Sequence, residues 1–132
     1  MSHTDMSAIA EHASPWPFAD TLERLTRAIT EAGMTIFATI DHAENARSVG
    51  MTMPPATVLI YGNPEGGTPV MAAAPLTALD LPLRVLVREC PDGTAAIAFH
   101  PVVAMFKQGG APEGDAARLE PAQRLLLAAI AP

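Results

Sequence analysis

The sequence predicts an α+β fold: a single two-layer domain, with one sheet of about four to five strands and helices packed mainly on one face. Two observations favour this class. A hydrophobic period of 3.6 residues before Gly33 gives way to a period of two after it, and further β-branched apolar runs follow between breakers. A Pro-Asp-Gly turn then joins two consecutive apolar runs, which indicates a hairpin within the sheet.

Composition and charge limit the class of protein. The 132 residues are 49% hydrophobic, so residues 17–132 are expected to form one domain, behind a flexible N-terminal arm at residues 1–16. A net charge of -6, with Lys107 as the only lysine, argues against nucleic acid as a partner. No apolar run approaches membrane-spanning length. The single cysteine, Cys90, favours a reducing compartment, and we expect the cytoplasm.

The first helix is predicted by apolar residues that recur at intervals of four, three and four. Phe18, Leu22, Leu25 and Ile29 share one helical face, and Gly33 stands where a C-terminal cap is expected. This amphipathic helix is expected to cover the sheet.

Residues 34–41 alternate as a strand. Met34, Ile36, Ala38 and Ile40 are expected to share its apolar face. Asp41 is expected both to end this strand and to cap a short helix over residues 42–49.

The apolar run at residues 57–61 does not alternate. It predicts a central strand that is covered on both faces or lies at a dimer contact. A turn-rich loop follows at residues 62–67. Thr68 is then expected to cap a short helix that ends before Pro75.

The second half of the chain predicts the hairpin and the last helices. Residues 83–89 and 94–100 are expected to be its paired strands. A short helix is expected at 101–106, a flexible connector at 109–114, and a final helix from Glu120 onward, with Leu125, Ala128 and Ala129 as packing positions.

Several phrases of the sequence carry a family resemblance. They are Ile40-Asp41-His42, Tyr61-Gly62-Asn63-Pro64, Gly67-Thr68-Pro69 with Met71, Asp80-Leu81-Pro82-Leu83, and Pro101. Their order and spacing resemble the family called domain of unknown function 302, over residues 18–132. The resemblance implies a compact α+β domain with one sheet, often a homodimer, and no established activity. Where this chain has Phe99-His100-Pro101, the family usually has an aromatic residue, Asn and an acidic residue before the proline.

Asp41 and His42 are the first candidates for chemistry. A carboxylate beside an imidazole can act as an acid–base pair, and His42 can ligate a metal. The alternative is structural, with Asp41 as a helix cap and His42 donating to a backbone carbonyl.

The loop from Gly62 to Thr68 is the second candidate. Backbone amides at a helix start can receive an anion, and the side chains of Asn63 and Thr68 can add hydrogen bonds. The loop lacks a nucleotide-binding fingerprint, and a turn with a cap explains most of its residues.

Asp80 and His100 complete the candidates. Asp80 can pair with Arg84 or Arg88, or can line a cleft shared with the other polar residues. His100 and His42 can both ligate a metal, but no spacing in the sequence enforces such a geometry, so we expect neither a metal nor a cofactor.

The sequence thus predicts a small homodimeric binding or sensing module for a small polar or anionic ligand. The predicted ligand residues are Asp41, His42, Asn63, Thr68, Asp80 and His100. One alternative is an enzyme that uses Asp41 or His42 as general base, with the amides of residues 62–68 stabilising negative charge. A scaffold protein without a ligand is another.

Overall fold

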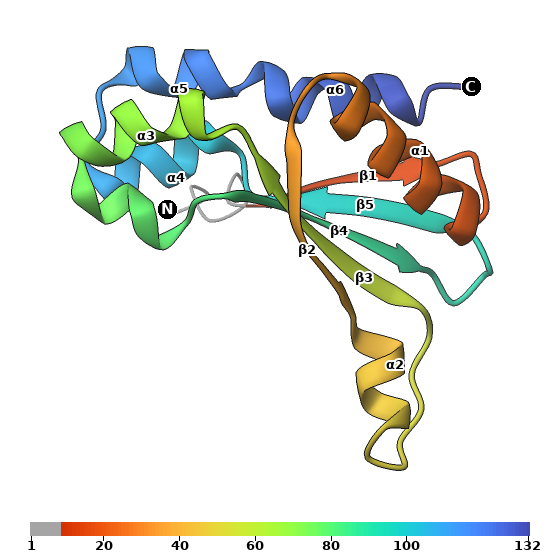
Figure 1. Ribbon diagram of the computed structural model, residues 1–132. Coiled ribbons are helices and arrows are strands. Elements are labelled where there is room, and N and C mark those ends of the chain that lie inside the picture. Colours follow the sequence, from red (N-terminus) through yellow and green to blue (C-terminus); the bar gives the residue numbers. More distant parts are fainter. Residues whose placement is uncertain (1–8) are drawn as a thin grey trace, which may run out of the picture.

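A five-stranded antiparallel sheet with the strand order β1-β5-β4-β3-β2 lies at the centre of the domain. The computed structural model describes residues 9–132, and Figure 1 shows how the helices surround the sheet. The strands are β1 (Ala10–Ser14), β2 (Thr35–Asp41), β3 (Ala56–Gly62), β4 (Leu83–Glu89) and β5 (Ala95–Phe99). The helices are α1 (Phe18–Glu31), α2 (His42–Arg47), α3 (Pro64–Ala73), the 3-10 helix η2 (Pro75–Leu79), α4 (Val102–Gly109), α5 (Glu113–Leu119) and α6 (Pro121–Ala129).

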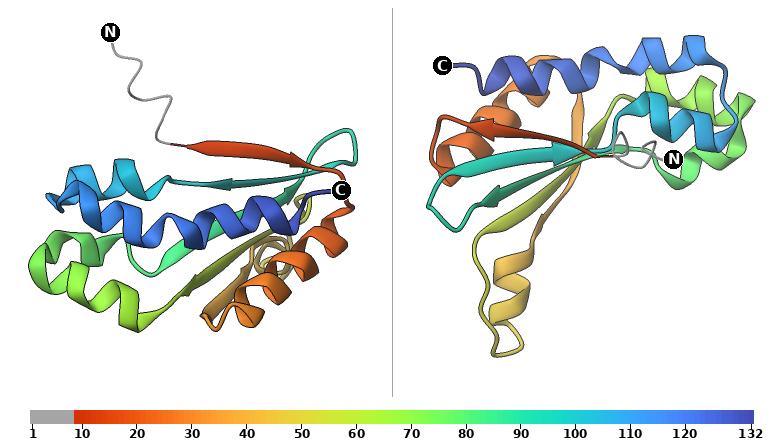
Figure 2. Two further views of the ribbon diagram at one scale, coloured as in Figure 1. Left: turned by 90° about the horizontal axis from the view of Figure 1, so that it is seen from above. Right: turned by 180° about the vertical axis from the view of Figure 1, so that it is seen from behind.

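The helices are distributed unevenly around the sheet. α1 and α6 lie over one of its faces, while α3, α4 and α5 gather beyond one end (Figures 1 and 2). α2 projects away from this helical layer (Figure 1). The core lies between the sheet and the helical layer, where Leu25, Val85 and Leu126 are fully buried. The predicted two-layer α+β class is confirmed.

The amphipathic helix α1 forms where the apolar period predicted it. Leu25 and Ile29 are fully buried, and Phe18 and Leu22 are partly buried against the same core. Gly33, just past the helix, adopts φ 82°, a left-handed conformation that favours glycine.

An irregularity in β2 changes which side chains share a face. Ile36 pairs with Tyr61, but Ala38 pairs with Ile60, so Phe37 is an extra residue in the ladder. Directly paired residues point to the same side of a sheet, so Ile36 lies on the face of buried Tyr61 and Ala38 on the opposite face. The expectation that Met34, Ile36, Ala38 and Ile40 share one face is therefore wrong, because simple alternation takes no account of a bulge.

The expected N-terminal arm is partly a strand. Residues 10–14 form β1, which pairs antiparallel along the whole of β5. The buried hydroxyls of Ser14 and Thr21 then lie 2.7 Å apart and join the end of β1 to α1. The flexible arm predicted for residues 1–16 is wrong over 10–14, since backbone pairing with β5 compensates for the weak apolar pattern there. Residues 1–8 of the predicted arm lie outside the described residues.

The helix after β3 starts earlier than expected. Thr68 lies inside α3, which begins at Pro64 and has Asn63 as its N-cap. The predicted cap at Thr68 is wrong because Asn63-Pro64 is the stronger start signal: an asparagine accepts hydrogen bonds from helix amides, and proline suits the first helical position.

The C-terminal half differs from expectation in two details. Helix α5 starts at residue 113, within the last two residues of the predicted connector, and continues through residues 115–119, for which no element was predicted. Of the predicted packing positions in α6, Leu125 and Ala129 are partly buried against the core, but Ala128 is exposed, and the fully buried residues of the helix are Gln123 and Leu126. The short length of α6 leaves its packing face poorly defined by sequence. The hairpin strands β4 and β5 are confirmed.

Candidate functional site

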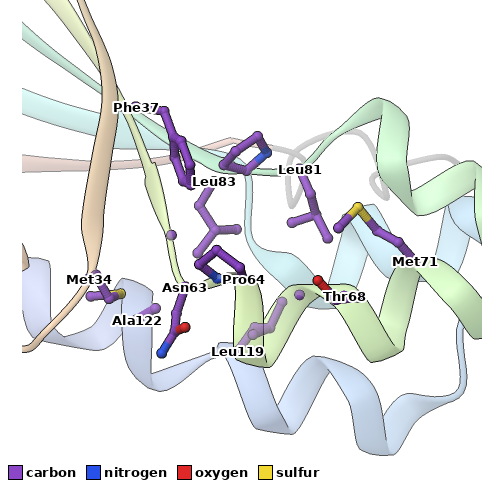
Figure 3. Close-up of a pocket in the computed structure, with 13 residues that line it drawn as sticks. Met34, Phe37, Asn63, Pro64, Thr68, Met71, Leu81, Leu83, Leu119 and Ala122 are labelled. Atoms are coloured by element: carbon purple, nitrogen blue, oxygen red, sulfur yellow. The ribbon is translucent and has the colours of Figure 1, made fainter.

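A cavity of about 180 Å³ lies where β3 passes into α3 (Figure 3). Segments distant in sequence enclose it: the start of β2, the β3–α3 junction, the segment that leads into β4, and helices α5 and α6. Its largest apolar lining side chains are Met34, Phe37, Met71, Leu81, Leu83 and Leu119. The sheet and three helices thus build one hollow with an apolar wall.

Polar side chains are rare in this wall. Among the described residues that line the cavity, Asn63 and Thr68 alone carry a polar side chain, and none is charged. The cavity wall can therefore form apolar contacts over most of its surface and side-chain hydrogen bonds only at Asn63 and Thr68.

Asn63 uses its two oxygen atoms in hydrogen bonds within the protein, whereas its side-chain nitrogen has no such partner among the described residues. Its Oδ1 accepts a hydrogen bond of 2.9 Å from the amide of Glu65. Its backbone carbonyl accepts from the amides of Gly66 and Gly67, both at 3.0 Å. These amides are used within the helix start, and Pro64 has no N–H to offer. The side-chain Nδ2 of Asn63 has no hydrogen-bond acceptor among the described residues, so this group is a donor left for a ligand, as is the hydroxyl of Thr68.

Glycine keeps the cavity open at Gly67. A Cβ added there would lie 3.8 Å from Met71 Cε and 3.9 Å from Leu81 Cδ1, which are ordinary contact distances to apolar atoms. A side chain at this position would therefore enter the cavity without first clashing with its walls.

Phe37 is a lining residue that the sequence analysis missed. The bulge in β2 places it at the cavity, where it is 50% exposed (Figure 3). Met34, the residue just before this strand, also lines the cavity. The one signal in the sequence was an aromatic side chain on the strand face expected to be polar.

Behind the cavity, a buried tyrosine connects the sheet to α6. Tyr61 is fully buried, and its hydroxyl donates to the carbonyl of Ala122 at 2.8 Å. Burial raises the pKa of Tyr61 well above its ordinary value, so the phenol stays protonated and keeps this donor. Since Ala122 itself lines the cavity, the bond positions one part of the wall.

Asp41 and His42 lie at the opposite end of the ladder from this cavity. Thr35 pairs with Gly62 beside the cavity, whereas Asp41 pairs with Thr57 at the far end, roughly 20 Å away by strand length. The Asp41 carboxylate accepts from the amide of Glu44 at 2.9 Å and caps α2 as predicted. An enzyme that uses Asp41 or His42 together with the amides of residues 62–68 is incompatible with this separation.

Asp80 and His100 line a different cavity, of about 150 Å³. Its other lining residues are Arg84, Ala104, Met105 and Gln108. The structure thus groups Asn63 with Thr68 and Asp80 with His100, and leaves Asp41 and His42 apart from both. The polar residues predicted to share one cleft are not gathered in one place.

The two cavities share a wall. Leu81, Pro82 and Leu83 line the first cavity, and the residues that flank them, Asp80 and Arg84, line the second. One short segment, which runs from η2 into the first two residues of β4, therefore lines both cavities.

The described His, Cys, Asp and Glu side chains of residues 9–132 form no group of three that could hold a metal ion. None of the helices there combines the length and apolar character that crossing a membrane requires.

Curated relatives carry the name of an ion channel. The chain is 37% identical over 79 residues to "Fluoride-specific ion channel FluC 1" of Brucella suis, and equally to the protein of that name from Brucella abortus. The match covers 60% of this chain but only 30% and 28% of those relatives. The chain therefore spans less than a third of the length of the curated relatives it matches.

A solved structure shares the fold over nearly the whole chain. It is the crystal structure of an uncharacterized conserved protein DUF302 from Bacillus stearothermophilus, with a TM-score of 0.78 and 17% identity, covering 93% of this chain and 95% of that one. Residues 10–131 also match the family described as "Domain of unknown function DUF302". The chain belongs to the DUF302 family.

Proposed function

We propose that this protein is a small-molecule binding module whose ligand occupies the cavity at the β3–α3 junction. The observation that carries the proposal is the lining: an apolar wall without a charged side chain, and the Nδ2 of Asn63 left as a donor. An ionised group placed there without a counter-charge would lose much of its hydration energy. The ligand is therefore uncharged and mostly apolar, with at least one hydrogen-bond acceptor, which is less polar than the ligand predicted from the sequence.

The volume of the cavity limits the size of ligand that it can hold. Its volume of about 180 Å³ is below the roughly 300–1,000 Å³ that drug-sized ligands occupy. Phe37 and the thioethers of Met34 and Met71 favour an aromatic ring, because sulfur and ring edges both attract π-systems. A single ring with a short carbonyl substituent suits these features.

The test compares three probes of similar size by NMR titration of the whole chain. Acetophenone carries an acceptor, ethylbenzene lacks one, and benzoate is charged. We expect acetophenone to bind most tightly and benzoate most weakly. Asn63→Asp retains an oxygen to cap α3 but loses the amide donor, so it should weaken acetophenone by about tenfold and leave ethylbenzene unchanged.

A bulky side chain at Gly67 tests whether the probes bind in this cavity. Gly67→Leu fills the cavity and should abolish binding of all three probes. Gly114→Leu is the matched variant, since a Cβ at Gly114 meets no atom within 4 Å. Binding that survives Gly67→Leu, or the absence of saturable shifts with every probe, contradicts the proposal and favours a scaffold role.

We also propose that the chain is a homodimer that pairs through the uncovered face of the sheet. Ile40, Val58, Leu86 and Ala98 are aligned across four strands by the register and form an apolar row on that face. Leu86→Glu should convert the dimer to a monomer in sedimentation experiments. Leu79→Glu, at a residue that is 80% exposed elsewhere, should leave the dimer intact. A monomeric wild-type chain, or a dimer that tolerates Leu86→Glu, contradicts this assembly.

The proposed compartment is the cytoplasm. Cys90 is the chain's only cysteine and is a free thiol. A reducing environment suits such a chain.

A second candidate function is a sensing domain that serves fluoride transport. The observation that favours it is the 37% identity to proteins named as fluoride-specific ion channels. Fluoride titrated into the chain should then produce saturable NMR shifts that equal concentrations of chloride do not. Identical responses to the two salts would contradict a fluoride-specific role.

A further inference from the structure

Arg84 differs from every other arginine of the described chain. Arg27, Arg47, Arg88, Arg118 and Arg124 each form an ion pair with a carboxylate. Arg24 lies 3.6 Å from the centre of the Trp16 ring. Within residues 9–132, Arg84 makes no such contact, although it lines the second cavity together with Asp80. In the single chain, this unpaired guanidinium beside a cavity is available for a ligand, next to the proposed dimer face that Leu86 shares with it.

The backbone holds the groups around this cavity in place. Arg84 is part of the β3–β4 ladder, opposite Ile60. The amide of Asp80 donates to Thr77 at 3.0 Å. The carbonyl of His100 accepts from the buried side chain of Gln123 at 2.7 Å. The positions from which these side chains extend are therefore fixed by the fold before any ligand arrives, which reduces the entropy lost on binding.

The cavity combines opposite charges that do not neutralise one another. Among the described residues, Asp80 and Arg84 form no ion pair together, although both line the same cavity of about 150 Å³. A guanidinium recognises a carboxylate through parallel N–H donors, and a carboxylate recognises an ammonium. Ala104 and Met105 add apolar contact on the α4 side, and Gln108 adds an amide.

We propose that this second cavity binds a small zwitterion, a molecule of amino-acid size that carries one carboxylate and one ammonium group. Arg84 donates to its carboxylate, and Asp80 accepts from its ammonium. The α4 side chains contact the remainder of the molecule. This site is independent of the ligand proposed for the first cavity.

The experiment titrates the intact chain with L-alanine and L-methionine, and with acetate and methylamine as singly charged probes. Saturable NMR shifts at residues lining the second cavity are expected for the amino acids, with weaker binding of the other two. Arg84→Gln and Asp80→Asn should each weaken the amino acids by about tenfold or more. Arg88→Gln is the matched control on the same strand face and should leave affinity within about twofold, because Arg88 is engaged by Glu11.

Other results would overturn the proposal. Acetate that binds as tightly as alanine indicates a simple anion site. Amino-acid shifts that are unchanged in Arg84→Gln place binding elsewhere. If Arg84→Gln instead dissociates a dimer and no amino acid binds, the guanidinium belongs to a contact between copies of the chain.

Discussion

The phenol of Tyr61, on β3, and the backbone carbonyl of Ala122, in the first turn of α6, are joined by a hydrogen bond of 2.8 Å. Tyr61 is fully buried at this contact. The bond crosses from the sheet to the helical layer beside the first cavity. It therefore contributes both to the stability of the domain and to the shape of the cavity wall.

Tyr61→Phe is expected to lower the free energy of unfolding by about 0.5–1.5 kcal/mol. The substitution keeps the ring but removes the hydrogen bond from the buried phenol to the carbonyl of Ala122. Urea denaturation of the two proteins measures the difference. A loss below about 0.5 kcal/mol would show that water or another donor replaces the phenol.

Stability should fall in alkaline solution because of the same residue. Burial raises the pKa of Tyr61 in the folded chain above the ordinary value of 10.0 that applies when the chain is unfolded. The contribution of Tyr61 to the free energy of unfolding is therefore complete below pH 10. It is lost as the pH rises above 10, by up to about 1.4 kcal/mol per pH unit. Since Tyr61 is the only tyrosine, its tyrosinate absorbance should appear together with unfolding, and Tyr61→Phe should lack this part of the pH dependence.

Gly67→Ala should stabilise the unliganded chain by about 0.5–1 kcal/mol. Alanine favours helix over glycine, and the added methyl meets Met71 and Leu81 at ordinary contact distance. Thermal unfolding without ligand measures the gain. A loss of stability would mean that the cavity is already filled by side-chain rearrangement in solution.

Gly109→Ala should lower the free energy of unfolding, although it also introduces alanine at a helical glycine. Its Cβ would lie 2.8 Å from Thr77 Cγ2 and 3.3 Å from the Thr77 backbone nitrogen, so α4 and η2 would have to separate. Overpacking of this kind costs about 1–3 kcal/mol. Comparing Gly109→Ala with Gly67→Ala in the same unfolding assay tests whether local space, rather than helix propensity, decides the sign.

Gln123→Ala should cost on the order of 3 kcal/mol. The buried amide of Gln123 donates to the carbonyl of His100 and accepts from the amide of Val102, and the substitution removes both hydrogen bonds from a buried place. Gln108→Ala is the control, because that glutamine is exposed. Equal stabilities of the two variants would contradict a role for Gln123 in holding α4 to α6.

Local patterns predicted most of the fold because the elements concerned satisfy their own hydrogen bonds and bury a regular face. The helix from Phe18 and the cap at Asp41 are of this kind. β1 was missed because it depends on its partner: residues 10–14 have a weak apolar pattern and become a strand through pairing with β5, distant in sequence.

The site was less predictable than the fold. Asn63 and Thr68 were correctly associated, since they are close in sequence and in space. Leu119 and Ala122 were not anticipated, because only the packing of α5 and α6 against the sheet brings them to the cavity. The bulge at Phe37 shifts the register of β2, and alternation alone cannot locate such a shift.

The segment from Asp80 to Arg84 gives the two cavities a common partition. If an occupant on one side displaces this partition, it changes the affinity on the other side, and thermodynamic reciprocity requires the same factor in both directions. In a domain where one segment separates an apolar cavity from a charged cavity, binding in the two cavities can be coupled. Such a domain can respond to the joint presence of two chemically different molecules.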